Sequence, residues 1–234
     1  MRTSHLGVIG ASMHTGSSGG GVPTRSLLFN GSHFLSMSGA NFDSATFDES
    51  NFAISVWLNY YSSIGTVAPL VTCTTSSPSD ALYLRLVRVT DGVAIEFYGQ
   101  NGATQVFDCI SSTVVGTDWQ HVYATFGGGV PHIYLNVDEV SYSTNSYTGV
   151  SPSEFSGTVR VANGLSGYLY QLAFFSGTVP AVGEIYDAGP KDVTGLTGLW
   201  SLLDVNGGVV TSDYVRSVDW TNNTAVAASA VIPS

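Results

Sequence analysis

Paired carboxylates are the first chemistry to look for in a chain with 17 Asp and Glu residues and only 7 Lys and Arg residues. Hydrolysis of a glycosidic bond by a retaining enzyme needs two carboxyl groups about 5 to 5.5 Å apart. Residues two or four apart share one face of a strand, and no two acidic residues have that spacing. Glu96, in the run AIEFYGQ, has no acidic companion, so we expect an exposed strand residue. The sequence therefore favours a protein without catalytic activity.

Nucleophile and zinc chemistry find no support in the spacing of the other reactive residues. The chain has no His-x-x-x-His pair, no Gly-x-Ser-x-Gly motif and no glycine-rich phosphate loop before a helix. Its two cysteines, Cys73 and Cys109, cannot form a zinc site alone and are too far apart for a Cys-x-x-Cys redox pair. Both follow apolar runs, so a disulfide between neighbouring strands and two buried free thiols stay open as alternatives.

The charge of the chain argues against nucleic acid as a partner. The formal net charge is −10 and Lys191 is the only lysine, whereas phosphate contacts require clustered basic residues. Arg85 and Arg88 are close in sequence, but a spacing of three places them on opposite faces of a strand. We expect both to be solvated residues of an edge strand. No run approaches the roughly 18 apolar residues of a membrane span.

The elements that must position any site are strands. Residues 119–142, WQHVYATFGGGVPHIYLNVDEVSY, show two runs in which apolar residues recur every second position, and Gly127, Gly128 and Gly129 lie between them. We expect the buried faces to be formed by Val122, Ala124 and Phe126 in the first run and by Ile133, Leu135 and Val137 in the second. Charged residues make up only 10% of the chain, fewer than exposed helix faces carry. The fold class is therefore predicted to be all-β.

The same segment resembles the laminin G-like, concanavalin A-like jelly rolls. The residues that carry the resemblance are Trp119, Gln120, His121, Val122, Tyr134, Leu135 and Asn136, and the blocks SLLFNGSHFLSM, NFAISVWLNYYSS and SGYLYQLAFFSGTVP occur in the family's order. The resemblance implies an antiparallel two-sheet jelly-roll sandwich with at most one short helix, in which His121 anchors its strand by hydrogen bonding. The family turns its second hairpin on Asn-Gly or Asp-Gly, where this chain has Asp138-Glu139. Because positive φ at Glu139 would be strained, we expect a longer or different turn.

Three regions follow from this pattern. Residues 1–23 are predicted to be a flexible N-terminal arm that ends in the Gly/Ser tether GSSGGGVP. Residues 24–188 are the predicted jelly roll, with a short helix at Val182–Asp187. Residues 189–234 are predicted to be a C-terminal extension that packs on the sandwich or on a neighbouring subunit.

Aromatic residues are the candidates for ligand binding, because sugar sites on sandwiches use exposed rings with amides around them. Tyr60 and Tyr61 are adjacent, so they point to opposite faces and one of them can be exposed. Tyr142 and Tyr147 flank STNS in a predicted loop. We take Tyr61, Tyr142 and Tyr147 as ligand-binding candidates. Trp57 and Trp119 are expected in the core.

The resemblance also raises the question of calcium, which many laminin G-like and pentraxin-like relatives hold with loop carboxylates and carbonyls. The candidate ligands are Asp43, in the loop with Asp48 and Glu49, and the Asp138-Glu139 turn, but neither has the dense acidic spacing of a dedicated loop. We therefore expect no cofactor, with calcium as the alternative at Asp43, Asp138 and Glu139.

The resemblance also implies where the protein acts and in what role. Short, self-standing domains of this family occur in tailed bacteriophages, which favours a non-catalytic virion protein: a capsid decoration, head fibre or tail-associated module at the virion surface. The expected partners are capsid or tail proteins, sister subunits in a homotrimer and, at the outward loops, a host-surface glycan. The alternative is a secreted or surface carbohydrate-binding domain, in one version calcium-dependent. A diverged glycosidase is the third, weaker hypothesis.

Overall fold

The computed structural model describes residues 26–39, 47–61, 64–75, 81–153, 155–188, 193–200, 209–210, 220–222 and 227–229. The predicted arm, residues 1–23, lies outside these ranges. The described residues form two packed antiparallel sheets and one helix, α2 (Val182–Ala188). The prediction of an all-β jelly-roll sandwich with one short helix at residues 182–187 is confirmed.

The first sheet has eight strands in the order β10-β9-β8-β3-β13-β1-β17, with β14 paired to β13. Its strands are β1 (Ser26–Asn30), β3 (Asn51–Tyr60), β8 (Gln120–Gly127), β9 (Val130–Leu135), β10 (Asp138–Glu139), β13 (Ser166–Ser176), β14 (Leu196–Trp200) and β17 (Ala227–Ser229).

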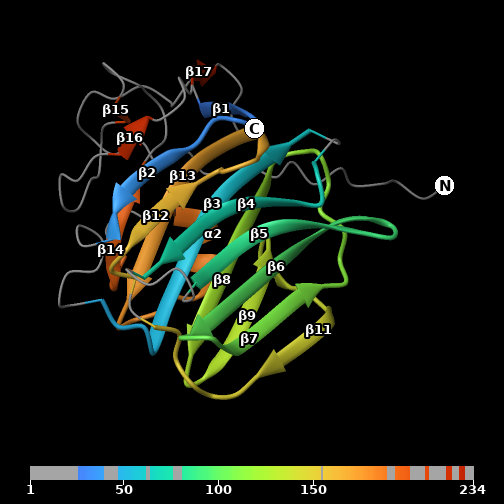
Figure 1. Cartoon of the computed structure of the whole chain (residues 1–234). Coiled ribbons are helices and arrows are strands. Elements are labelled where there is room, and N and C mark those ends of the chain that lie inside the picture. The colour runs from blue at the N-terminus through green and yellow to red at the C-terminus, as the bar shows by residue number, and fades with distance from the viewer. Residues whose placement is uncertain are drawn as a thin grey trace.

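The second sheet has nine strands in the order β11-β7-β6-β5-β4-β12-β2-β16-β15. Its strands are β2 (Leu35–Ser38), β4 (Val67–Thr74), β5 (Ala81–Val89), β6 (Gly92–Asn101), β7 (Thr104–Ser111), β11 (Tyr142–Tyr147), β12 (Thr158–Val161), β15 (Val209–Val210) and β16 (Trp220–Asn222). In Figure 1 strands β4 to β7 lie in front of β3, β8 and β13. One side of each sheet therefore faces the core and the other faces outward.

Aromatic rings fill the space between the sheets. Phe52 of the eight-stranded sheet contacts Phe126 in the same sheet and Phe97 in the other, with ring centroids 5.7 and 6.1 Å apart. Phe107 stacks on Phe126 at 5.1 Å. All four are buried, and fully burying one such ring stabilises the fold by about 1.5–3 kcal/mol. Alternation with a period of two places these rings on the inner faces.

The hairpin predicted in residues 119–142 is present as β8 and β9. Gly128 and Gly129 form its turn with φ of 59° and 82°, which is the left-handed conformation that glycine adopts without penalty. The predicted core residues on both strands are buried, except that Val137 is 43% exposed. The alternation therefore ends at Leu135, two residues earlier than predicted from the sequence.

The second hairpin turns at Asn136 and Val137, since Asp138 pairs with Leu135 and Glu139 with Tyr134. Asn136 takes the positive φ, 61°, and Asn tolerates this conformation better than most residues. The prediction that Asp138-Glu139 form the turn is wrong, because both residues belong to strand β10. As expected, the turn is not Asn-Gly or Asp-Gly. It is a two-residue turn of Asn136 and Val137, and not a longer one.

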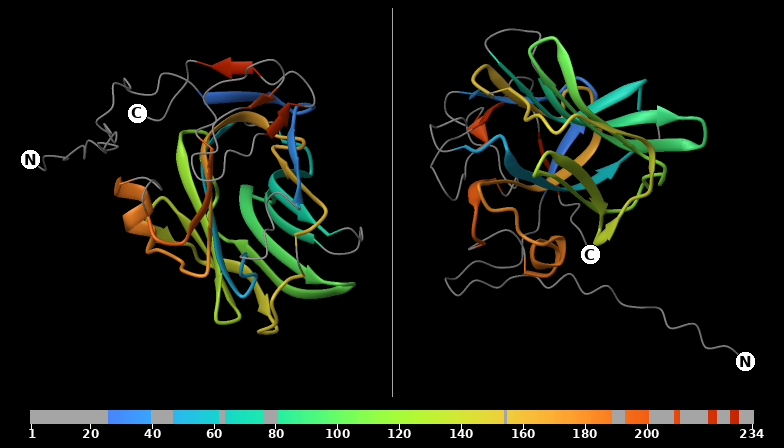
Figure 2. Two further views of the ribbon diagram at one scale, coloured as in Figure 1. Left: turned by 90° about the vertical axis from the view of Figure 1, so that its left-hand side faces the viewer. Right: turned by 90° about the horizontal axis from the view of Figure 1, so that it is seen from below.

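Helix α2 covers part of the outer side of the eight-stranded sheet (Figure 2). Ile185 of α2 packs there against Tyr123, Phe175 and Leu199 in a second apolar cluster. Beyond residue 188 the described segments add strands to both sheets: β14 pairs with β13, β17 with β1 and β16 with β2.

Cys73 and Cys109 are buried free thiols. They lie on β4 and β7, and two strands separate these in the sheet order. Three strand spacings amount to roughly 14 Å, and a disulfide requires Cα atoms less than about 7 Å apart. Of the two alternatives left open by the sequence, the structure shows the free thiols.

Candidate functional site

The outer side of the nine-stranded sheet carries a cluster of polar and aromatic side chains on its central strands β5, β6 and β7. Strand register places Tyr83 opposite Tyr98, Tyr98 opposite Asp108, and Arg85 opposite Glu96. Residues paired in register share a face, so the five side chains lie on one surface. We call Tyr83, Arg85, Glu96, Tyr98 and Asp108 the outer-face cluster.

Arg85 and Glu96 form a two-pronged ion pair at the centre of this cluster. The Arg85 Nε donates to Glu96 Oε2 at 2.6 Å, and Nη2 donates to Oε1 at 2.8 Å. This hydrogen bonding raises the pKa of Arg85. The Glu96 side chain is only 6% exposed, so the prediction that Glu96 is an exposed strand residue is wrong. Its burial follows from its partner, which compensates the charge.

Arg85 and Arg88 were predicted to be solvated residues of an edge strand. Their strand, β5, is not an edge strand, because it lies between β4 and β6. Each arginine has its own partner. Arg88 donates from Nη2 to the carbonyl of Ile64 at 2.6 Å. The two arginines therefore do not form a basic patch.

Asp108 lacks the compensation that Glu96 has. Its Oδ1 atom is buried and has no hydrogen-bond partner among the described residues. Burial raises the pKa of Asp108, the negative charge of Glu96 raises it further, and Arg85 opposes both. Burial of a carboxyl oxygen without a hydrogen-bond partner lowers the stability of the fold.

Two tyrosines complete the cluster. The rings of Tyr83 and Tyr98 are 5.9 Å apart, and the Arg85 guanidinium lies 5.3 Å from the centre of the Tyr83 ring. Both tyrosines are half-buried, so each ring presents part of its surface outward. The cluster thus combines aromatic surface, a fixed ion pair and a carboxylate with unused acceptor capacity.

A β-bulge brings Asp108 to this surface. Gln100 pairs with Gln105 but Gly99 pairs with Phe107, so Val106 is an extra residue in β7. If the strands paired without this bulge beyond Gln100 and Gln105, Asp108 would stand opposite Phe97 and point into the core. Glu96 and Asp108 are neighbours across β6 and β7, so the spacing of acidic residues along a single strand does not reveal this pair. The two-residue connection Gly102-Ala103 indicates the hairpin of β6 and β7, but no feature of the sequence predicts the bulge.

On the opposite sheet, His121 is fully buried and hydrogen-bonded. Its Nε2 lies 2.8 Å from Ser55 Oγ, and its backbone N–H donates to Asn136 Oδ1 at 3.1 Å. Burial lowers the pKa of His121 to about 4, so the ring is neutral at physiological pH. With both Ser55 and His121 buried, no substrate reaches the pair. The ring anchors the strand, as the resemblance implied.

Comparison with known proteins identifies the family. The model of the concanavalin A-like lectin/glucanases superfamily matches residues 35–181, which is more than half of the chain. The chain belongs to this superfamily. The resemblance noted in the sequence is thereby confirmed. Among curated proteins no sequence match was found.

Solved structures share this concanavalin A-like fold at low sequence identity. A Bacteroides ovatus protein proposed to bind carbohydrate has a TM-score of 0.65 and 16% identity, over 88% of this chain and 59% of that one. The heptameric SAP-like pentraxin of Limulus polyphemus has a TM-score of 0.58 and 13% identity, over 89% and 96%. The enzymatically active domain of tailspike protein 2 of bacteriophage CBA120 has a TM-score of 0.47 and 12% identity, over 67% and 27%. The chain spans about three fifths of the Bacteroides protein, and identities this low show a common fold alone.

The concanavalin A-like sandwich does not bring the three candidate ligand tyrosines together. Tyr61 is 44% exposed and donates its hydroxyl hydrogen to Tyr168 at 2.7 Å, whereas Tyr60 is buried, as their opposite directions predicted. Tyr142 is half-buried, accepts from the Ile133 N–H and packs against the core. Tyr147 is 47% exposed. The predicted loop between Tyr142 and Tyr147 is strand β11, at the edge of the nine-stranded sheet.

Trp57 and Trp119 are half-buried, so their prediction as core residues is wrong. Both belong to the outer side of the eight-stranded sheet. Trp57 packs there against His121 and Tyr186, with ring centroids 5.2 and 5.4 Å away.

The calcium candidates divide between described and undescribed residues. Asp43 lies outside the described residues. Glu139 accepts hydrogen bonds from His132 at 2.7 Å and from Tyr142 at 3.3 Å, and Asp138 is exposed beside it. Within the described ranges no three His, Cys, Asp or Glu side chains come together as metal ligands do. Calcium binding at Asp43, Asp138 and Glu139 stays a prediction.

The described part of the chain contains no helix with the length and apolar character that a membrane span requires.

Proposed function

We propose that this chain is a non-catalytic carbohydrate-binding module that holds its glycan on the outer-face cluster. The observation that carries the proposal is Asp108, a half-buried residue on the outer side of the sheet, whose Oδ1 has no hydrogen-bond partner among the described residues. Sugars offer many hydroxyl donors on a ring with apolar C–H faces. A carboxylate with free acceptor positions beside aromatic rings is suited to both features.

The cluster assigns a role to each member. Asp108 accepts hydrogen bonds from sugar hydroxyls, and the Tyr98 ring beside it supports a sugar face. Glu96 fixes the Arg85 guanidinium in one orientation, so little side-chain entropy is lost when a ligand binds. Because the charge of Arg85 is already neutralised, the surface favours hydroxyl groups over the carboxylate or sulfate of an acidic sugar.

The absence of catalysis in this proposal rests on Glu96. Both of its oxygens accept from Arg85, and a general acid must hold a proton that it can release to the leaving group. A reducing-end assay on polysaccharides is the test. We expect no product with the wild-type chain, and turnover that disappears in Asp108→Asn would contradict a pure binding role.

A glycan array with three proteins tests the binding itself. Asp108→Asn keeps the shape of the side chain and removes the charged acceptor. Asp91→Asn is the matched control, since Asp91 is exposed in the turn between β5 and β6 and its substitution changes the net charge equally. We expect glycan binding by the wild type and by the control, and a loss of at least about tenfold in Asp108→Asn, the usual cost of removing one charged hydrogen-bond partner.

For the setting of this module we propose the surface of a virion, with a trimer as the assembly and capsid or tail proteins as neighbours. An extracellular carbohydrate-binding protein is the alternative. Assembly has physical support in β11, an edge strand whose residue Tyr147 is 47% exposed, because exposed edge strands are commonly covered in oligomers. Detection of the chain in purified virus particles by mass spectrometry would favour the virion over the alternative.

A further inference from the structure

A second surface with the features of a ligand site lies on the other sheet, away from the outer-face cluster. Asn59 of β3 pairs with Tyr168 of β13. Leu58 pairs with Gln120, so Trp119, the residue before β8, comes next to Asn59 on its other side. Antiparallel register thus sets an aromatic, an amide and an aromatic residue side by side.

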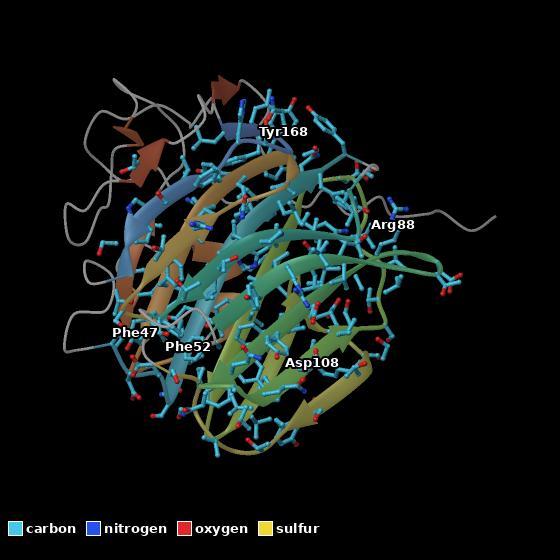
Figure 3. All side chains as sticks on the ribbon, in the orientation of Figure 1. Phe47, Phe52, Arg88, Asp108 and Tyr168 are labelled. Atoms are coloured by element: carbon cyan, nitrogen blue, oxygen red, sulfur yellow. The ribbon has the colours of Figure 1, made fainter. Side chains whose placement is uncertain are left out.

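Ring contacts extend this row to a fourth residue. The Trp119 and Tyr168 ring centroids are 6.4 Å apart, and Tyr61 meets Tyr168 edge to face at 5.6 Å. Tyr61 is 44% exposed, and Asn59, Trp119 and Tyr168 are half-buried. We call these four residues the aromatic row. Figure 3 shows Tyr168 at the end of the sandwich near β1, well away from Asp108.

Within the described residues, the helix that packs on the outer side of this sheet lies over another part of it. Ile185 of helix α2 packs on Ala53, Tyr123 and Phe175 farther along the same outer side, and this apolar cluster does not include the aromatic row. Monomeric proteins rarely leave clustered aromatic rings partly exposed without a partner. The aromatic row is therefore a candidate binding surface.

The hydrogen-bonding state of the row indicates what that occupant is. Tyr61 and Tyr168 share one hydrogen bond of 2.7 Å between their hydroxyl groups, so one of the two phenolic hydrogens remains for another acceptor. The Trp119 indole Nε1 has no hydrogen-bond partner among the described residues. Buried donors normally have one. The row thus offers flat apolar surface together with the remaining hydroxyl hydrogen of the Tyr61–Tyr168 pair, whereas the Trp119 Nε1 is buried.

Charge narrows the ligand further. The row contains no Asp, Glu, Lys, Arg or His side chain, and the hydrogen bond with Tyr168 raises the pKa of Tyr61 to about 12, so the Tyr61 phenol stays neutral in any ordinary buffer. An acidic ligand finds no cation in the row and a basic one finds no carboxylate. A neutral sugar has the C–H face, the oxygen acceptors and the lack of charge that this surface fits.

We propose that the aromatic row is a second carbohydrate-binding site, specific for a neutral sugar unit that stacks on Tyr61 and hydrogen-bonds to Asn59 and the Tyr168 hydroxyl. The chain then holds glycan at two places on opposite sheets, one built around a carboxylate and one without charge. This site is independent of Asp108 and stands or falls separately from the function proposed above.

Isothermal titration of the full chain tests the proposal, with the neutral oligosaccharide that gives the strongest signal on an array of neutral and acidic glycans. Tyr61→Ala removes the stacking ring, Tyr61→Phe keeps the ring without its hydroxyl, and Val150→Ala is a control at another exposed apolar position, 49% exposed. We expect one class of sites to weaken at least about tenfold in Tyr61→Ala, with Tyr61→Phe and Val150→Ala within about threefold of wild type. Sodium chloride should leave the affinity of this class unchanged.

Unchanged titrations in Tyr61→Ala, or an array on which only acidic glycans bind, would overturn the second site. The same titrations on Asp108→Asn separate the two proposals. Loss of a class of sites in Tyr61→Ala supports the aromatic row, and loss of a class in Asp108→Asn supports the outer-face cluster. A different class lost in each variant supports both proposals, and an unchanged titration contradicts the proposal to which that variant belongs. Circular dichroism of each variant confirms that the loss is not one of folding.

Discussion

Asp108 is kept in surroundings that disfavour its charge. Burial and the neighbouring Glu96 raise its pKa above the ordinary value of 3.8, so the folded chain binds this proton more tightly than the unfolded chain does. Above the raised pKa the charged carboxylate lowers the free energy of unfolding, and this penalty disappears as the pH falls towards 3.8. Residues that cost stability are common in binding sites, where the ligand supplies the missing partners.

Asp108→Asn is therefore expected to raise the thermal midpoint at pH 7 by a few degrees, while the same variant loses glycan binding. The gain should shrink as the pH is lowered towards 4, because wild-type Asp108 then becomes neutral as well. Thermal unfolding of both proteins between pH 4 and 8 measures this difference. A variant that is less stable than wild type at pH 7 would show that Asp108 is a structural residue instead.

His121 has the opposite linkage. Burial lowers its pKa from 6.5 to about 4, so the neutral ring stabilises the fold fully above pH 6.5 and this contribution is lost as the pH falls towards 4. The wild type should lose roughly 3 kcal/mol across this window from His121 alone.

A His121→Gln variant has no such titration. We expect it to be about 1–3 kcal/mol less stable than wild type at pH 7, since the partners Ser55 and Asn136 are fitted to the imidazole. The gap should narrow between pH 6.5 and 4. Urea unfolding at several pH values is the measurement, and parallel pH profiles for the two proteins would refute the account of His121.

At the scale of elements, the two glycines of the β8–β9 turn make different demands on the chain. Both have positive φ, but a Cβ at Gly128 meets nothing within 4 Å, while one at Gly129 comes 2.7 Å from the Gly149 Cα. Gly128→Ala should lower the free energy of unfolding by about 1–2 kcal/mol, because alanine must adopt the left-handed conformation there. Gly129→Ala must in addition displace the backbone that follows β11, so it should cost at least about 3 kcal/mol. Equal urea midpoints for the two variants would refute the close approach of these segments.

What the sequence predicted at this scale depended on periodicity and on glycine. The buried faces of β8 and β9 and their Gly turn followed from alternation and local turn chemistry, and the α2 helix followed from the resemblance to the family. The register of β7 did not, because a single extra residue at Val106 moves Asp108 from the core face to the outer face. Bulges of this kind depend on packing between strands, here that of Phe97 and Phe107, and a search along one strand at a time cannot find the site that they create.

At the scale of the molecule, the sandwich leaves an edge strand open. Among the described strands β11 pairs with β7 alone, and its residues are mostly exposed. We expect light scattering to give a mass near three times 24.5 kDa, unchanged between buffers with EDTA and with calcium, because Glu139 is already engaged by His132. A monomer, or a mass that changes with calcium, would contradict the proposed trimer or its independence of metal.

The central claim is that a carboxylate on the outer side of the nine-stranded sheet receives a glycan. Its most direct test is the glycan array with the wild type, Asp108→Asn and the matched Asp91→Asn. The account predicts the same set of bound glycans for the wild type and Asp91→Asn, with at least one structure lost in Asp108→Asn. An Asp108→Asn variant that is folded and binds every glycan as the wild type does would contradict it.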